Sequence, residues 1–359
     1  MSQGKVVVAL SGGVDSSVAA ALLKQQGYEV VGLTLRLWTD PAHPPASNSE
    51  AAARLTAETL DIPLHVVDIV DTFHREIVQF FLDEYARGVT PNPCVRCNRL
   101  VKWGVLLEQA LALGADYMAT GHYARKRIIG DGRQELLRAV DHSKDQTYVL
   151  HVLTQERLER ALFPVGEYTK PEIRDLARTL GLPAATRSDS QDLCFLAGED
   201  YRDFIRRNAP GIARPGPILA SDGRILGEHT GLAYYTIGQR KGLCISSPVP
   251  LYVLAKDPAS NTLIVGLEAE LGSSELTAQQ VNWIAGEAPK GPFQAQVKTR
   301  YTAKESEAQV TPLEGGRAEV RFDAPQRDIT PSQAAVFFDG DLVLGGGLIT
   351  ESAHSQNMI

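Results

Sequence analysis

A glycine-rich turn between an apolar strand and a helix constrains the fold of this chain more than any other stretch. Residues 6–10 have a buried-strand pattern, residues 18–23 have a helical one, and the turn at 11–17 contains two glycines. Glycine lets the backbone approach a ligand closely, and the free amides of the turn and of the helix N-terminus suit an anion. No Gly-Lys-Ser/Thr follows, which excludes a Walker A loop. An ordinary turn capped by Asp15 or Ser16 is the alternative.

Strand and helix patterns alternate over residues 1–207, which predicts an α/β domain built on a parallel sheet. Ligands bind such sheets at the carboxyl ends of the strands. Residues 11–17, 36–38 and 121–122 all follow predicted strand ends, so we expect them to form one nucleotide pocket. The predicted strands lie at 6–10, 30–35, 64–67 and 117–120, the predicted helices at 49–60, 73–85, 100–112, 144–150, 155–162, 170–180 and 201–208, and a hairpin at 124–140.

The pattern changes near residue 208, where prolines and glycines become frequent and helical periodicity fades. Short strands then predict a small central β domain over 208–275 and a C-terminal β-barrel over 276–359. Five or six short strands at such spacing favour a closed sheet. The predicted strands lie at 217–219, 251–255 and 262–266 in the central domain, and at 296–299, 307–312, 317–322, 334–339 and 342–348 in the barrel.

Length and composition fit a globular protein with several domains. The chain of 359 residues has room for two or three domains, and no apolar run approaches the roughly 20 residues of a membrane span. A strand pattern begins almost at once and leaves no room for a signal peptide, so we expect a cytoplasmic protein with no membrane partner. The net charge of −7 argues weakly against nucleic acid. Among local basic clusters, Arg125, Lys126 and Arg127 are the best candidates for RNA contact.

Three of the four cysteines form a second candidate site. Cys94 and Cys97 lie in a Cys-x-x-Cys before a predicted helix, and Asn98 as its cap would put Cys97 at a helix N-terminus, where a thiolate is stabilised. Cys194 lies in an aperiodic loop. In a cytoplasmic protein such cysteines favour either a zinc or iron–sulfur site or persulfide chemistry, and spacing ranks neither above the other. Small buried hydrophobes are the third alternative, which we expect for Cys244.

Taken in order, the motifs resemble those of the tRNA-specific 2-thiouridylase family, in the ATP pyrophosphatase superfamily. The resemblance runs from about residue 4 to 350 and implies an ATP pyrophosphatase domain, a small central β domain and a C-terminal β-barrel. It is carried by Ser-Gly-Gly-Val-Asp-Ser at 11–16, Gly-Leu-x-Leu-x-x-Trp at 32–38, Asn-Pro-Cys-x-x-Cys-Asn at 92–98, Thr-Gly-His-Tyr at 120–123, Lys-Asp-Gln-x-Tyr at 144–148, Phe-Pro-Val-Gly at 163–166, and by residues 190–195, 227–231, 236–243, 297–301 and 330–337.

The resemblance implies an ATP-dependent sulfurtransferase. The implied reaction adenylates the C2 oxygen of the tRNA wobble uridine and replaces it with sulfur, giving 2-thiouridine, AMP and pyrophosphate. Cys97 matches the nucleophile and Cys194 the persulfide carrier, and the two can pair as a transient disulfide. The implied cofactors are ATP and Mg²⁺, and the implied partners are tRNAs for lysine, glutamate and glutamine and a cysteine desulfurase or sulfur-relay protein. Matched by motif, Ala9, Leu10, Ser11, Gly12, Gly13, Val14, Asp15, Ser16, Leu35 and Gly121 contact ATP; Asn92, Pro93 and Cys94 contact the target base; and His122, Lys144, Asp145, Gln146, Arg300, Tyr301 and Gln333 contact tRNA.

Two positions depart from the family pattern. Cys94 stands where many members have aspartate, which leaves the base contact open and favours a [4Fe-4S] cluster on Cys94, Cys97 and Cys194. Ser332 replaces a usual glycine beside Gln333, which weakens the expectation of a turn there. Two other functions stay open. One is an ATP pyrophosphatase acting as an amide ligase on a small substrate, which leaves the thiols unexplained, and the other is a non-catalytic RNA-binding or zinc-stabilised protein.

Overall fold

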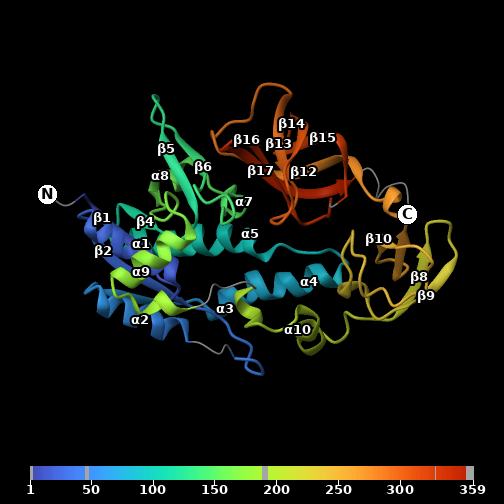
Figure 1. Cartoon of the computed structure of the whole chain (residues 1–359), viewed down its shortest axis with the longest axis horizontal. Coiled ribbons are helices and arrows are strands. Elements are labelled where there is room, and N and C mark those ends of the chain that lie inside the picture. Colours follow the sequence, from blue (N-terminus) through green and yellow to red (C-terminus); the bar gives the residue numbers. More distant parts are fainter. Residues whose placement is uncertain (1–2, 45–47, 188–192, 328, 353–359) are drawn as a thin grey trace.

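The computed structural model describes residues 3–44, 48–187, 193–327 and 329–352. Figure 1 shows a sheet domain at the N-terminal end, a closed barrel formed by the last strands, and a small β domain, with long helices running between them. The α/β class, the central β domain and the C-terminal barrel are therefore confirmed. The sequence predictions for residues 188–192 and for a frayed tail at 354–359 lie outside the described residues.

The N-terminal domain is built on five parallel strands in the order β3-β2-β1-β4-β7. The central strand β1 is fully buried at Val6, Val7 and Val8, as a strand covered on both faces must be. The order reverses between β1 and β4, which is the switch point where ligands of such sheets bind. The strands are β1 (Lys5–Ala9), β2 (Glu29–Arg36), β3 (Leu64–Asp68), β4 (Tyr117–Ala119) and β7 (Ala161–Leu162).

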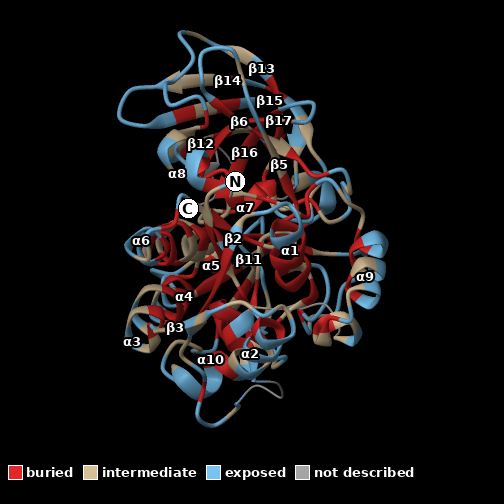
Figure 2. Ribbon diagram, turned by 90° about the vertical axis from the view of Figure 1, so that its left-hand side faces the viewer, coloured by how far each residue is buried: buried red, intermediate tan, exposed pale blue. Residues whose placement is uncertain are grey.

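Helices cover the sheet and continue beyond it (Figure 2, buried residues in red). Two of the long helices contain π-helical stretches, η1 (His74–Gln79) and η2 (Asn98–Leu106). Phe81, Phe195 and Phe204 pack edge-on or tilted against one another and join this helical layer to the central domain. The remaining helices are α1 (Val14–Gln25), α2 (Ser49–Thr59), α3 (Val70–Phe73), α4 (Phe80–Ala86), α5 (Pro93–Cys97), α6 (Leu107–Ala112), α7 (Thr147–Leu150), α8 (Gln155–Arg160), α9 (Lys170–Thr179) and α10 (Tyr201–Asn208), with short 3₁₀ turns at Pro183–Thr186, Cys194–Leu196, Leu232–Tyr234 and Glu268–Glu270.

The barrel is a sheet in the order β12-β15-β14-β13-β16-β17 that closes by pairing β12 with β17. The hairpin β5–β6 of the N-terminal domain extends this sheet, because β6 pairs with β17 at Leu137 and Leu342. The central domain is a separate sheet in the order β10-β11-β8-β9. The strands are β5 (Ala124–Ile128), β6 (Gln134–Arg138), β8 (Gly216–Ala220), β9 (Ile225–His229), β10 (Tyr252–Asp257), β11 (Thr262–Gly266), β12 (Ser273–Trp283), β13 (Phe293–Lys298), β14 (Ser306–Leu313), β15 (Arg317–Gln326), β16 (Ala334–Asp339) and β17 (Leu342–Ser352).

Several local expectations need correction. The expected helix at 144–150 is one short turn, because Asp145 turns inward to accept hydrogen bonds from Ala139 N and Thr147 Oγ1. Strand β9 and most of β12 were not predicted. Cys244 is exposed with φ +54°, so the expectation of a buried small hydrophobe is wrong there.

Candidate functional site

The turn after β1 leaves the first amides of α1 without a side-chain cap. Gly13 is the N-cap, and no side chain bonds the first turn from that position, so the alternative of an ordinary turn capped by Asp15 or Ser16 is wrong. Ser16 instead donates through Oγ to Gly13 O at 3.1 Å and accepts from Ser11 N at 3.3 Å. Gly12 adopts φ +74°, a conformation that favours glycine. The turn therefore presents backbone donors at a helix N-terminus, which suits phosphate.

Asp15 is anchored inside this site by residues from other elements. Its carboxylate accepts from Lys170 Nζ at 2.7 and 2.8 Å and from the Tyr123 hydroxyl at 2.8 Å. Arg187 Nη1 donates to Gly12 O at 2.8 Å. Two cations thus flank the glycine turn, and no sequence pattern predicts either of them, because both come from distant segments whose side chains reach the turn only in the folded chain.

Gly121 brings the end of β4 against the turn. A Cβ at Gly121 would lie 2.6 Å from Ser16 N and 2.8 Å from the Asp15 carbonyl carbon, so only glycine lets the two segments pack this closely. Leu35, near the end of β2, is half-buried and packs on the core. The expected convergence of strand ends at one place is consistent with the sheet order, in which β2, β1 and β4 are neighbours.

Cys94, Cys97 and Cys194 come together although they are distant in sequence. The charges of Cys94 and Cys97 raise the pKa of Cys194, and the charge of Cys94 raises that of Cys97, which places the three thiols within electrostatic reach. Cys94 and Cys194 are exposed to solvent, and Cys97 is half-buried. All four cysteines of the chain are free thiols. Among the described residues, no group of three or more Cys, His, Asp or Glu side chains is placed to bind a metal ion, and this includes the three thiols.

The helix carrying Cys94 and Cys97 begins earlier than expected. Asn92 caps α5 by accepting from Val95 N at 3.2 Å, and Pro93 occupies the first turn. Cys97 therefore lies one turn inside the helix, and the predicted cap at Asn98 is wrong. Surrounding protein atoms raise the pKa of Cys97 and of Cys194 above the usual value of a thiol, although Cys194 is exposed to solvent, and the charge of Lys102 opposes this effect.

The barrel reaches the loop before α5 through Gln333. Gln333 Nε2 donates to Thr90 O at 2.8 Å, and its Oε1 lies 3.5 Å from Asn92 Nδ2. Ser332 adopts φ +67° and bonds Glu84, so the turn expected beside Gln333 forms despite the replacement of glycine. These contacts fix the loop of Asn92 and Pro93 against the barrel end.

The other residues expected to contact tRNA have different environments. Tyr301 is 44% exposed, with its ring edge-on to Tyr148, and is open to a ligand. Arg300 is held by Ile237 O and Thr330. Asp145 is buried, which raises its pKa, and it bonds internally. Lys144 is half-buried, Gln146 accepts from Tyr123 N through Oε1, and His122 is only 6% exposed.

The basic run 125–127 is engaged within the protein. Arg125 pairs with Asp341, Arg127 pairs with Glu135, and Lys126 donates to the carbonyls of Leu158 and Glu159. Burial lowers the pKa of Lys126 to about 8. This run is therefore a structural cluster and a weaker candidate for RNA contact than its charge suggests.

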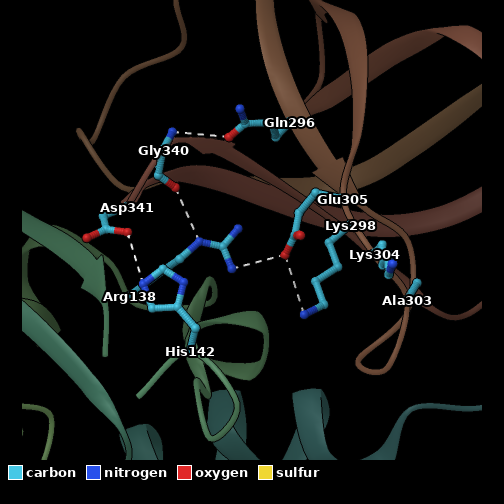
Figure 3. Close-up of a pocket in the computed structure, with 9 residues that line it drawn as sticks. All are labelled: Arg138, His142, Gln296, Lys298, Ala303, Lys304, Glu305, Gly340 and Asp341. Carbon is cyan, nitrogen blue, oxygen red and sulfur yellow. Dashed lines mark hydrogen bonds and ion pairs between the residues drawn. The ribbon is translucent and has the colours of Figure 1, made fainter. Parts of the chain in front are cut away.

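A cavity of about 520 Å³ lies between the β5–β6 hairpin and the barrel (Figure 3). Arg138 spans it, stacked 3.8 Å above the Phe338 ring and paired with Glu305 at 3.0 Å. Lys298 also pairs with Glu305, at 3.6 Å. Most charges of the cavity are thus neutralised by one another, and it lies away from the thiols and the glycine turn.

Comparison with known proteins identifies the family. Family models match the chain as a tRNA methyl transferase HUP domain over residues 4–198, a tRNA methyl transferase PRC-barrel domain over 202–267 and an aminomethyltransferase β-barrel domain over 273–349. The tRNA-specific 2-thiouridylase MnmA of Moorella thermoacetica is 49% identical, over 97% of this chain and 100% of that protein. The chain belongs to the tRNA-specific 2-thiouridylase family.

Other members of the tRNA-specific 2-thiouridylase family match along nearly their whole length. That of Roseiflexus castenholzii is 48% identical, over 96% of this chain and 99% of its own. Among solved structures, a 4-thiouridine synthetase–RNA complex with bound ATP is 17% identical and covers 58% of this chain and 50% of that one, with a TM-score of 0.35. This last likeness is too distant to bear on what the chain binds. In the described residues, the structure contains no helix long and apolar enough to cross a membrane.

Proposed function

We propose that this protein is a tRNA-uridine 2-sulfurtransferase. In the proposed reaction, ATP adenylates the C2 oxygen of the wobble uridine, and sulfur then replaces that oxygen, giving 2-thiouridine, AMP and pyrophosphate. The names of its relatives support tRNA thiolation. The observation that carries the proposal is the proximity of Cys194 to Cys97 and Cys94, because an amide ligase needs no such group of thiols, and a zinc-stabilised protein needs a metal-binding group that the described residues do not form.

The glycine turn is the proposed ATP site. The uncapped amides of α1 and the turn would bind the phosphates, and the close packing at Gly121 would keep the nucleotide at the switch point. The proposed contacts are Ala9, Leu10, Ser11, Gly12, Gly13, Val14, Asp15, Ser16, Leu35 and Gly121. Magnesium would arrive with ATP and neutralise its phosphates, since the Asp15 carboxylate is already held by Lys170 and Tyr123.

Adenylation serves the chemistry because the oxygen of a uridine carbonyl is a poor leaving group. AMP departs far more readily, with the electron pair of the broken C2–O bond. The target base must also leave its stack, at a cost of a few kcal/mol. Asn92, Pro93 and Cys94 are proposed to receive it, on the loop that Gln333 fixes to the barrel. Lys144, Asp145, Gln146, Arg300, Tyr301 and Gln333 are proposed to position the tRNA.

Two sulfur routes fit the three thiols. In one, Cys194 carries the persulfide, and Cys97 releases the transferred sulfur by forming a disulfide with Cys194. In the other, Cys94, Cys97 and Cys194 would hold a [4Fe-4S] cluster, which supplies sulfide. A cysteine desulfurase or relay protein is the proposed donor, and tRNAs for lysine, glutamate and glutamine are the proposed substrates.

The test is nucleoside mass spectrometry on unmodified tRNA incubated anaerobically with the protein, ATP, magnesium and sulfide or a persulfide source. We expect 2-thiouridine only with ATP, and none from Cys97→Ala or Cys194→Ala. Cys244→Ala is the matched control, since Cys244 is exposed and lies outside the thiol group. AMP without thiolation would refute the sulfur route, and 2-thiouridine from both cysteine variants would refute the role of the thiols.

A further inference from the structure

Lys102 lies on η2 within electrostatic reach of the three thiols. Its side chain is half-buried on η2, and its charge lowers the pKa of Cys94, Cys97 and Cys194 against the stronger effect of burial. Among the described residues, no carboxylate forms an ion pair with Lys102, whereas the buried cations Arg138 and Lys170 pair with Glu305 and Asp15. A cation that has no acidic partner and lies at the edge of a solvent-accessible site can bind an anionic group of a substrate.

The π-helical geometry of η2 brings Lys102 to the thiols. Lys102 follows Cys97 by five positions, and in an α-helix such residues point about 140° apart, at about 100° per residue. A π-helix bonds residue i to residue i+5 and has more residues per turn than an α-helix, so positions five apart lie nearer to the same face. The π-helical stretch Asn98–Leu106 begins directly after Cys97. Lys102 is thereby turned toward the side of the helix that carries Cys97.

His122 holds the Lys102 ammonium in place. The distance from Lys102 Nζ to His122 Nε2 is 3.1 Å, and since an ammonium only donates, Nε2 must accept. The proton of the ring then lies on Nδ1, which donates to Thr120 Oγ1 at 2.7 Å. Burial and the charge of Lys102 lower the pKa of His122 well below its usual value, so the ring is neutral and keeps its acceptor. At 6% exposure, His122 lies behind Lys102.

We propose that Lys102 is a further catalytic residue of the sulfur-transfer step, and that His122 positions it. This inference rests on the proposed function. The nucleophilic sulfur attacks C2 of the adenylated uridine, the C2–O bond breaks, and AMP leaves with the electron pair of that bond. The Lys102 ammonium stabilises the negative charge that develops on the oxygen of the departing AMP, and no proton has to be transferred. The tRNA contact that family resemblance implies at His122 is then made through Lys102.

The experiment compares Lys102→Gln and Lys102→Arg with the wild-type protein. Exchange of labelled pyrophosphate into ATP, with tRNA present, reports adenylation, and 2-thiouridine formation under single-turnover conditions reports sulfur transfer. We expect Lys102→Gln to keep the exchange within about threefold and to slow thiolation roughly a hundredfold, and Lys102→Arg to recover part of that rate. Arg99→Gln is the matched control, because Arg99 lies on the same π-helical stretch but bonds Gln280 of the barrel.

His122→Gln tests the positioning role separately. We expect kcat for thiolation to fall about tenfold while KM for tRNA stays unchanged, because His122 acts through Lys102. A raised KM with unchanged kcat would show a direct RNA contact and overturn this part of the inference. Thiolation by Lys102→Gln at the wild-type rate, or an equal loss of exchange and thiolation, would overturn the role of Lys102. A wild-type protein that makes no 2-thiouridine would refute the proposed function itself.

Discussion

His151 should make the protein acid-sensitive in a measurable way. The ring is fully buried where the N-terminal domain meets the barrel, and a Cβ on Gly346 of β17 would lie only 2.9 Å from its Cδ2. Nδ1 donates to Tyr148 O at 2.7 Å, while Nε2 has no hydrogen-bond partner among the described residues. Protonation would place a charged N–H against apolar neighbours, and burial accordingly lowers the pKa of His151 to about 4.

The magnitude follows from linkage between folding and protonation. A depressed pKa means that the folded state favours the neutral ring, so stability from this group is complete above the unfolded pKa of about 6.5 and is lost as the pH falls toward 4. Between pH 7 and pH 5 the folded state should lose about 2 kcal/mol through His151. The variant His151→Gln cannot take up the proton, so it should lack this part of the pH dependence whatever its stability at pH 7.

The assay is urea unfolding at pH 7 and pH 5, followed by tryptophan fluorescence for both proteins. Other titrating groups, His122 included, are shared by the two proteins and cancel in the comparison. We expect the wild type to lose about 2 kcal/mol more of its unfolding free energy than the variant. Equal losses in the two proteins would refute the assignment of a buried, neutral His151.

Three further substitutions test the site and its supports. Gly121→Ala would set a Cβ 2.6 Å from Ser16 N, so we expect KM for ATP in the exchange reaction to rise at least tenfold, and an unchanged KM would contradict the packing of β4 against the glycine turn. Gly166→Ala would set a Cβ 1.7 Å from Ala124 O, so urea unfolding should show a loss of about 2 kcal/mol, and wild-type stability would contradict that contact. Asn92→Ala removes the cap of α5, and calorimetry should show a loss of about 1 kcal/mol, whereas no loss would mean that the cap is not needed.

Features that depend on neighbouring residues were predictable from the sequence. The helix Ser49–Thr59, the helix Tyr201–Asn208 and the strand Thr262–Gly266 lie where periodicity predicts them. The glycine turn was predictable too, because strand, glycines and helix are consecutive. Its cap was not, since Ser16 bonds Gly13 O and Ser11 N in place of the first helical amides.

Features that depend on distant residues were not predictable from local pattern. Lys170 forms an ion pair with Asp15, which is distant in sequence, and no spacing pattern in the sequence predicts that pair. A π-helical stretch has no sequence signature of its own, so Lys102 was missed. Residue type groups Cys194 with Cys94 and Cys97 as a candidate metal ligand, and the family resemblance assigns it as the persulfide carrier, since the loop before it has no periodicity.

The pairing of β6 with β17 has a consequence for how the chain is made. During synthesis, the hairpin β5–β6 emerges long before its partner β17, which is the last strand that the structure describes. Until then, the backbone amides and carbonyls along one edge of the hairpin are unpaired, and they can form hydrogen bonds with strands of other chains. Domains generally fold as units from the N-terminus, but this N-terminal domain receives its final strand contact from the C-terminal end. A chain shortened before Leu342 should therefore aggregate through β6, even with every residue of the nucleotide and thiol sites intact.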